Sequence, residues 1–328
     1  MTHHSLTRKS KHTLIVFTIS LVAVIFLVRA VDWHEALRIF RSGVSAGSLL
    51  LFSLMAISIA LIYGYRWRLL VDQRLNLKTS LNASVLCLGG NMFLPARGGD
   101  LLRVHYTHLV ARMSHAEVLS RLFVEKIIDL VTIAAVGVLA SACLYGPNAS
   151  TQFSILIIFT VTALSIALIA VVMTKYFGEQ MLRWLHPVFN LAGKTAFFER
   201  HVTHLVRDAC RSLTLTTVLL PGILTLLMWL SVYALSYVLA ARFVGVTLSY
   251  QESLLVLFAG ALGLMLPAAP SGIGTFHASV VSAFIFLGRS SAEGMLVATA
   301  IHLLFFVIYV VPAAFLYSRW RLTQNAPG

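Results

Sequence analysis

Two arginines and an aspartate occupy a segment that interrupts a hydrophobic run. The segment Gly89–Arg103 reads GGNMFLPARGGDLLR and contains Arg97, Asp100 and Arg103. The planar guanidinium of arginine can bind two phosphate oxygens at once, and glycines let backbone N–H groups approach an anion closely. Asn91 adds an uncharged donor. The segment therefore predicts a phosphate-binding site, with anchoring of the charges at a membrane surface as the structural alternative.

Two carboxylates lie nearby in the sequence. Glu125 and Asp129 are four residues apart, so they share one face of a helix. They stand at the beginning of an apolar helix, where acidic side chains are costly and usually functional. We expect them to form ion pairs with Arg97, Arg103 or Lys126, either as a purely structural arrangement or to balance a substrate, or to carry a coupling proton.

A second break, LPAAPSGIGTF, spans Leu266–Phe276 and carries no fixed charge. His277 follows it at the start of a short helix. A histidine here is either sensitive to pH or buried and hydrogen-bonded. The residues expected to break the helices are Pro95, Gly98 and Gly99 in the first segment and Pro267, Pro270, Gly272 and Gly274 in the second.

The composition is that of a membrane protein. Of 328 residues, 59% are hydrophobic and 11% are charged, and several runs of about 18 or more residues carry almost no charge. The net charge of +13 is attributed to basic loops on one side of the membrane, so no nucleic-acid partner is expected. Three scattered cysteines and the absence of nucleotide-binding, metalloprotease and serine-hydrolase motifs predict no metal, no cofactor and a transporter more readily than an enzyme.

The elements that must position these residues are helices. Residues 1–328 are expected to form a single polytopic all-α membrane domain. Six full spans are predicted at about 13–31, 46–65, 114–145, 153–173, 213–241 and 294–317, with Ser114 and Glu117 as a capping box. The apolar runs 81–94 and 253–266 are too short to cross a bilayer and are expected to be re-entrant. An amphipathic, net basic linker covers about 175–211.

The basic residues set the orientation. With the N-terminus inside, twenty of the 25 lysines and arginines fall on the cytoplasmic side and five fall outside. Both termini are then cytoplasmic. The two broken segments enter from opposite sides, and both contain Leu-Pro-Ala after a short apolar helix. The pattern predicts an inverted repeat, about 46–145 and 213–317, which is a plan that transporters use to build a substrate site from broken helices.

Three motifs in this order carry a family resemblance: NMFLPARGGDLLR, VEKIIDL and LPAAPSGIGTF. Over nearly its whole length the chain resembles the flippase-like membrane domain of lysylphosphatidylglycerol synthases. The positions that match the family pattern are Asn91, Pro95, Arg97, Gly99, Arg103, Glu125, Asp129, Pro267, Pro270, Gly272 and Gly274. Asp100, Lys126 and His277 stand where glutamate, arginine and glutamate are usual, and only the first two keep the charge.

The resemblance implies translocation of anionic, aminoacylated or polyprenyl-linked lipids. No soluble aminoacyl-transferase domain accompanies this chain, so it is not expected to make lysyl-lipid. The sequence therefore predicts a lipid flippase of the prokaryotic inner membrane that works by alternating access. The expected substrate-binding residues are Asn91, Arg97, Asp100, Arg103, Glu125, Asp129 and His277. The alternatives are an integral-membrane transferase with Asp100 or Glu125 as base, and a non-transporting accessory that partners a lipid-synthesis enzyme.

Overall fold

The protein is built from helices. The computed structural model describes residues 32–42, 45–94, 97–145, 151–212, 214–266 and 270–325, and every regular element in these ranges is helical. In this part of the chain, four helical segments are long and apolar enough to cross a membrane: Ala46–Leu70, His115–Leu144, Thr217–Phe243 and Ser291–Leu322. The prediction of an all-helical, multi-pass membrane protein is confirmed, and these four segments coincide with four of the six expected spans.

The other two expected spans are not among these four. The span 13–31 lies outside the described residues. The span 153–173 forms the first half of α7 (Thr151–Leu191), a helix of 41 residues. At about 1.5 Å per residue this helix is about 60 Å long, roughly twice the thickness of the hydrocarbon core. The helix is therefore longer than one span needs, and its second half belongs to the basic linker that begins at about residue 175.

The first half of the chain forms α2 (Trp33–Ser42), α3 (Ala46–Leu70), α4 (Leu77–Phe93), α5 (Gly98–Ala111) and α6 (His115–Tyr145). Ser114 caps α6 as predicted, because the Glu117 N–H donates to Ser114 Oγ at 3.1 Å, which is one of the two hydrogen bonds of the expected capping box. The Glu117 carboxylate forms an ion pair with Arg74 at 3.1 Å. Local sequence thus determines where α6 starts. The same helix carries Glu125 and Asp129 further along.

The second half continues with α8 (Thr195–Phe197), the π-helical η2 (Phe198–Thr203), α9 (His204–Ser212), α10 (Leu215–Leu227), the π-helical η3 (Met228–Tyr233) and α11 (Ala234–Phe243). It ends with α12 (Tyr250–Met265), the short η4 (Pro270–Gly272), α13 (Thr275–Phe286) and α14 (Ser291–Asn325). The expected span 213–241 is the run α10–η3–α11. A capping box between Ser249 and Glu252 starts α12.

The chain divides into two compact units, each drawn from separate stretches of sequence. The first unit comprises Met1–Ile59, Val85–Gly99 and Ser231–Gly328, and the second comprises Ala60–Ser84 and Asp100–Leu230. These boundaries differ from those of the two expected repeats. Each unit is described by itself below.

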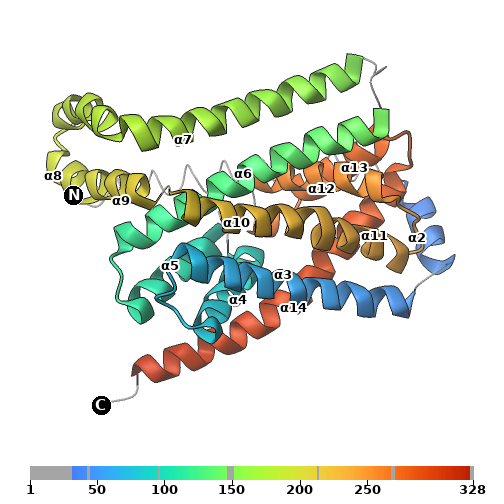
Figure 1. Ribbon diagram of the computed structural model, residues 1–328. Coiled ribbons are helices and arrows are strands. Elements are labelled where there is room, and N and C mark those ends of the chain that lie inside the picture. The colour runs from blue at the N-terminus through green and yellow to red at the C-terminus, as the bar shows by residue number, and fades with distance from the viewer. Residues whose placement is uncertain are drawn as a thin grey trace, which may run out of the picture. The chain divides into compact units, whose positions relative to one another are not determined.

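Close helix packing characterises the first unit, where α12, α13 and α14 follow one another as neighbours (Figure 1). A Cβ atom on Gly263 of α12 would lie 2.7 Å from the carbonyl oxygen of Thr275 in α13, and one on Gly89 of α4 would lie 2.5 Å from that of Tyr309 in α14. Only glycine allows such approaches. The Tyr309 hydroxyl donates to the carbonyl oxygen of Ala56 at 2.9 Å, which ties α14 to α3.

In the second unit α6 and α7 run side by side, α9 packs on both, and α10 packs on α6 (Figure 1). The linker 175–211 has a small hydrophobic core of its own, formed by the buried side chains of Leu182, Phe198 and Val206. Its helix α9 is strongly amphipathic, as the sequence predicted. The linker is therefore a packed helical hairpin.

Both predicted breaks fall between short helices, α4 and α5 in one case and α12 and α13 in the other. Each break contains a non-glycine residue with positive φ, Arg97 at 56° and Ser271 at 62°. This conformation costs about 1–2 kcal/mol for an L-residue, so the surrounding structure must hold it. Both halves of the chain follow the expected order of long helix, short helix, break, short helix and long helix.

Candidate functional site

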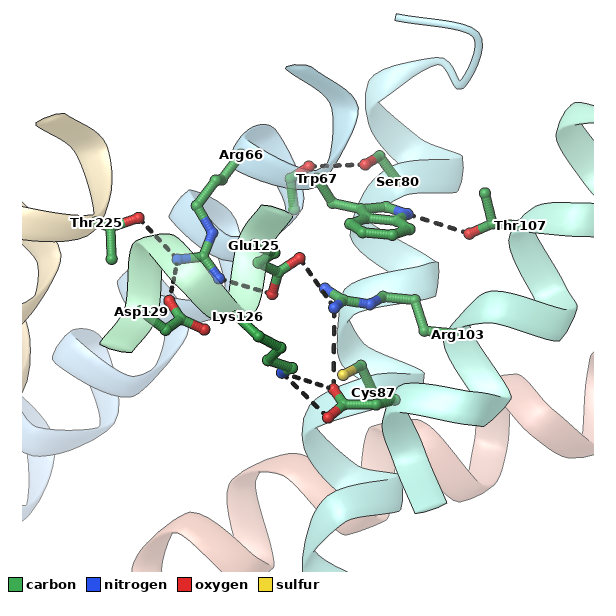
Figure 2. Close-up of polar contacts among 12 residues, drawn as sticks. Arg66, Trp67, Ser80, Cys87, Arg103, Thr107, Glu125, Lys126, Asp129 and Thr225 are labelled. Carbon is green, nitrogen blue, oxygen red and sulfur yellow. Dashed lines mark hydrogen bonds and ion pairs between the residues drawn. The ribbon is translucent and has the colours of Figure 1, made fainter. Parts of the chain in front are cut away.

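Arg66 is completely buried in the second unit, within a group of charged side chains (Figure 2). Its Nη1 donates to Asp129 Oδ1 at 2.6 Å and to Thr225 Oγ1 at 2.7 Å. Its Nη2 donates to Glu125 Oε1 at 2.7 Å. The guanidinium also lies over the Tyr63 ring, 4.4 Å from its centroid. These contacts replace the water that a buried cation loses.

Arg103 shares the same carboxylate. Its Nη2 lies 2.9 Å from Glu125 Oε2, and the exposed fractions of the two side chains are 0% and 1%. The guanidinium stacks over the Trp67 ring at 4.0 Å, and the Trp67 Nε1–H donates to Thr107 Oγ1 at 3.1 Å. Glu125 therefore bridges two buried arginines, one through each oxygen.

A third pair completes the group. Lys126 Nζ lies 3.0 Å from Asp100 Oδ2, and Arg103 Nη2 lies 3.9 Å from Asp100 Oδ1. We call the six residues the charge cluster: Arg66, Arg103, Lys126, Asp100, Glu125 and Asp129. The cluster has three cations and three anions, so its net charge is zero. Pairing of opposite charges lowers the free-energy cost of burying ionised side chains inside a membrane protein.

Helical spacing brings these side chains together. On α3, Tyr63, Arg66 and Trp67 share one face. On α5, Asp100 lies in the first turn, and Arg103 follows it by three residues on the same face. On α6, Glu125 and Asp129 are one turn apart. Spacings of three and four residues place side chains on a common helical face, so three helices each present a polar stripe to the others.

The first unit brings the two helix breaks together. Ser271 Oγ donates to Met92 Sδ at 3.0 Å, so the second break contacts the end of α4 at the first. A Cβ atom on Gly99 would collide with the carbonyl oxygen of Cys87 and the nitrogen of Asn91, so the start of α5 lies directly against α4. The breaks expected to form one substrate site are neighbours in this unit.

Three predicted binding residues lie in the first unit. The Asn91 Nδ2 donates to Cys87 Sγ at 3.7 Å. Arg97 is exposed at the first break. His277 is buried in the first turn of α13 and stacks on the His302 ring with 5.1 Å between centroids. No hydrogen-bond partner reaches His277 Nδ1 among the described residues.

The structure thus divides the predicted binding residues between two places. Asp100, Arg103, Glu125 and Asp129 belong to the charge cluster, and Asn91, Arg97 and His277 lie at the breaks. Of the three cations expected as possible partners, Arg103 pairs with Glu125. Asp129 pairs with Arg66 instead of with the expected cations, and Lys126 pairs with Asp100. Of the break residues, Gly98, Gly99, Gly272 and Gly274 lie at the two breaks and Pro270 begins η4, while Pro95 and Pro267 lie outside the described residues.

Arg66 was not predicted as a site residue. The span was expected to end at about residue 65, with Arg66 among the cytoplasmic basic residues, whereas α3 continues to Leu70 and both Arg66 and Trp67 are fully buried. One signal was available, because Leu69–Val71 follow as an apolar run, whereas a helix that ends at a membrane surface normally runs on into polar residues.

The arrangement can recognise a phosphate. Two guanidinium groups that converge on the two oxygens of one carboxylate can equally converge on two oxygens of a phosphodiester. Among the residues that the structure describes, no group of three or more His, Cys, Asp or Glu side chains could hold a metal ion.

A family model described as the lysylphosphatidylglycerol synthase TM region matches residues 13–313, which is most of the chain. A search of curated proteins found no match.

Proposed function

We propose, from the premise that the chain belongs to the family of the lysylphosphatidylglycerol synthase TM region, that it moves a phosphate-bearing lipid between the two leaflets of a membrane. The substrate class is an anionic or polyprenyl-linked (glyco)phospholipid. The family resemblance implies the prokaryotic inner membrane, and the distribution of basic residues predicts that both termini lie in the cytoplasm.

The observation that carries this proposal is the Arg66–Glu125–Arg103 bridge inside apolar helices. Glu125 is 1% exposed and both arginines are 0% exposed. Buried ionisable residues in membrane helices are expensive and mark pathways for polar substrates. In this conformation Glu125 pairs with both arginines, and the lipid phosphate takes its place when the site opens.

The two helix breaks provide the route by which the lipid head group crosses the membrane in this proposal. We infer that the two broken-helix hairpins are re-entrant from opposite sides and form an inverted repeat, so that alternating access exposes the breaks to each leaflet in turn. Arg97, exposed at the first break, makes the first contact with the head group. The second break offers His277 and no fixed charge, so the head-group site is biased toward the first break. Irregular backbone at this depth is tolerated where it lines a polar path.

The alternative of a membrane transferase needs a carboxylate base that a substrate can reach. Glu125 is enclosed by Arg66 and Arg103, and Asp100 is held by Lys126 at 3.0 Å. Neither oxygen pair is open to a lipid-linked donor in this arrangement. No specific contact favours the accessory function over transport either, so transport is the function that the geometry supports best.

Reconstitution in vesicles with fluorescent lipids tests the proposal. The wild type is expected to speed the exchange of phosphatidylglycerol or a polyprenyl phosphate between leaflets, and Arg97→Ala is expected to slow it. Arg319→Ala, which removes an exposed arginine near the end of α14, is the matched control. If Arg97→Ala moves lipid as fast as the wild type, the role of Arg97 is wrong.

Two results would replace the proposal itself. Formation of a new product from a lipid and an activated donor by purified protein would establish a transferase. Co-purification of a lipid-synthesis enzyme, together with no exchange by the isolated protein, would establish an accessory.

A further inference from the structure

A cavity lies between α9 and the stretch of α7 around residues 175–179, in the linker of the second unit. Its volume is about 370 Å³, and it is lined by Lys175, Tyr176, Gly178, Glu179, Arg207, Cys210 and Arg211. Gly178 sets the spacing of the two helices, since a Cβ atom there would lie 2.5 Å from Cys210 Sγ. Cys210 connects the lining to the linker core, because it packs against the buried side chains of Leu182, Phe198 and Val206. We call this cavity the linker cavity.

One ion pair shapes its wall. Arg207 Nε lies 2.6 Å from Glu179 Oε1, and Arg207 Nη2 donates to Glu179 Oε2 at 3.0 Å. The hydrogen bond from Arg207 and the neighbouring charges of Arg183 and Arg211 hold the pKa of Glu179 below its ordinary value. Glu179 thus stays charged and neutralises one arginine of the lining.

The other two cations of the lining have no such partner. Within the part of the chain that the structure describes, no ion pair joins Lys175 or Arg211 to a carboxylate, and both side chains are exposed. The Lys175 Nζ lies 5.8 Å from the centroid of the Tyr176 ring. Glu179 is the only acid among the lining residues, so the lining carries an excess of positive charge that fits an anion.

The position of the cavity points to a membrane lipid as the source of that anion. Lys175 follows directly after the apolar first half of α7, which is where the expected span 153–173 would reach the membrane surface. Tyr176 is 72% exposed, and Phe177 and Trp184 are also exposed. Exposed aromatic rings beside basic residues are typical of the interface, where the rings lie at the level of the head groups.

We propose that the linker cavity binds the phosphate of an anionic membrane phospholipid between Lys175 and Arg211, as a resident lipid distinct from the transported one. The acyl chains would extend along the exposed apolar surface of α7. Free phosphate shares the same chemistry, and the experiment below separates the two sources. The proposal does not depend on transport, because the cavity includes no residue of the charge cluster or of the breaks.

Labelling of Cys210 reports on occupancy, because this thiol lines the cavity. Burial raises the pKa of the Cys210 thiol, so the labelling is followed at alkaline pH with neutral N-ethylmaleimide. Full-length protein in detergent is titrated with phosphatidylglycerol, phosphatidylcholine or inorganic phosphate, and the labelled peptides are quantified by mass spectrometry. The exposed Cys143 serves as an internal reference.

Phosphatidylglycerol is expected to slow the labelling of Cys210 and not that of Cys143. The concentration needed for half protection is expected to rise about 30-fold in Lys175→Gln/Arg211→Gln, which removes two cations from the cavity. Lys194→Gln/Arg321→Gln removes the same charge from exposed positions outside it and should behave like the wild type.

Equal protection by phosphatidylcholine, or equal loss of protection in the two double variants, would overturn the proposal. If inorganic phosphate protects Cys210 as strongly as phosphatidylglycerol does, the assignment of the site to a lipid is overturned. Arg97→Ala should keep full protection of Cys210 even where it slows transport, so a failure of this proposal and a failure of the transport proposal give different results.

Discussion

Replacing Glu125 by glutamine tests the charge cluster most directly. The change keeps the volume of the side chain and removes the charge that Arg66 shares at 2.7 Å and Arg103 shares at 2.9 Å. Breaking a buried ion pair by removing one partner costs about 3–5 kcal/mol. Arg66 keeps Asp129 at 2.6 Å and Thr225 at 2.7 Å, so the loss falls mainly on Arg103. We therefore expect the lower end, about 3 kcal/mol.

Asp129→Asn is the matched control. Asp129 is 15% exposed on its side chain, and Arg66 retains Glu125 when the Asp129 charge is removed. The expected loss is smaller, about 1–2 kcal/mol, the cost of weakening one hydrogen bond to a charged group. Unfolding by sodium dodecyl sulfate in mixed micelles, followed by far-ultraviolet circular dichroism, gives the free energy of unfolding of each variant.

A double-mutant cycle sharpens the test. Arg103→Met/Glu125→Gln removes one cation and one anion, so Arg66 and Asp129 remain as a balanced pair. The double variant is expected to lose less free energy of unfolding than the two single variants lose together. The expected difference is about 1–3 kcal/mol, as for residues in contact. Additivity within about 0.5 kcal/mol, or a Glu125→Gln variant as stable as the wild type, would show that the bridge does not hold the helices together.

Two further predictions concern the breaks and the repeat. Gly99→Ala should destabilise the protein by about 1–3 kcal/mol or prevent its folding, because the added Cβ meets the backbone of Cys87. Gly222→Ala is the control, because it has open space around it, and it should be neutral or slightly stabilising in the same unfolding assay. Single cysteines at the exposed positions Lys78 and Gln251, which lie at the starts of α4 and α12, should react with a membrane-impermeant thiol reagent from opposite sides of the membrane. Reaction of both from the same side would rule out the inverted repeat.

Local sequence determined the course of the helices well. The capping residue Ser114 fixed the start of α6, and the proline- and glycine-rich segments fixed where the short helices stop. These features act over a few residues, because capping and backbone restriction are short-range effects. For the same reason the repeated order of long and short helices was visible in the sequence.

The partners of charged side chains were predicted less well. Arg103 was one of three cations expected as possible partners of Glu125, and the two side chains do pair. Arg66 lies 59 residues from Glu125 along the chain, and its charge alone resembled that of a surface anchor. An arginine at a membrane surface and one buried among acids have the same local sequence signal, so only the packing of α3 against α6 distinguishes them.

The amino-acid sequence was enough to predict an all-helical membrane protein with two interrupted helices and a basic linker, because hydrophobicity and helix breaking are properties of short segments. Tertiary structure decided which charges neutralise one another, that Ser271 of the second break touches Met92 of the first, and that Lys175 and Arg211 line one cavity. Those pairings depend on contacts between residues far apart in the chain. Burial sets their energies, and burial exists only once the helices have packed.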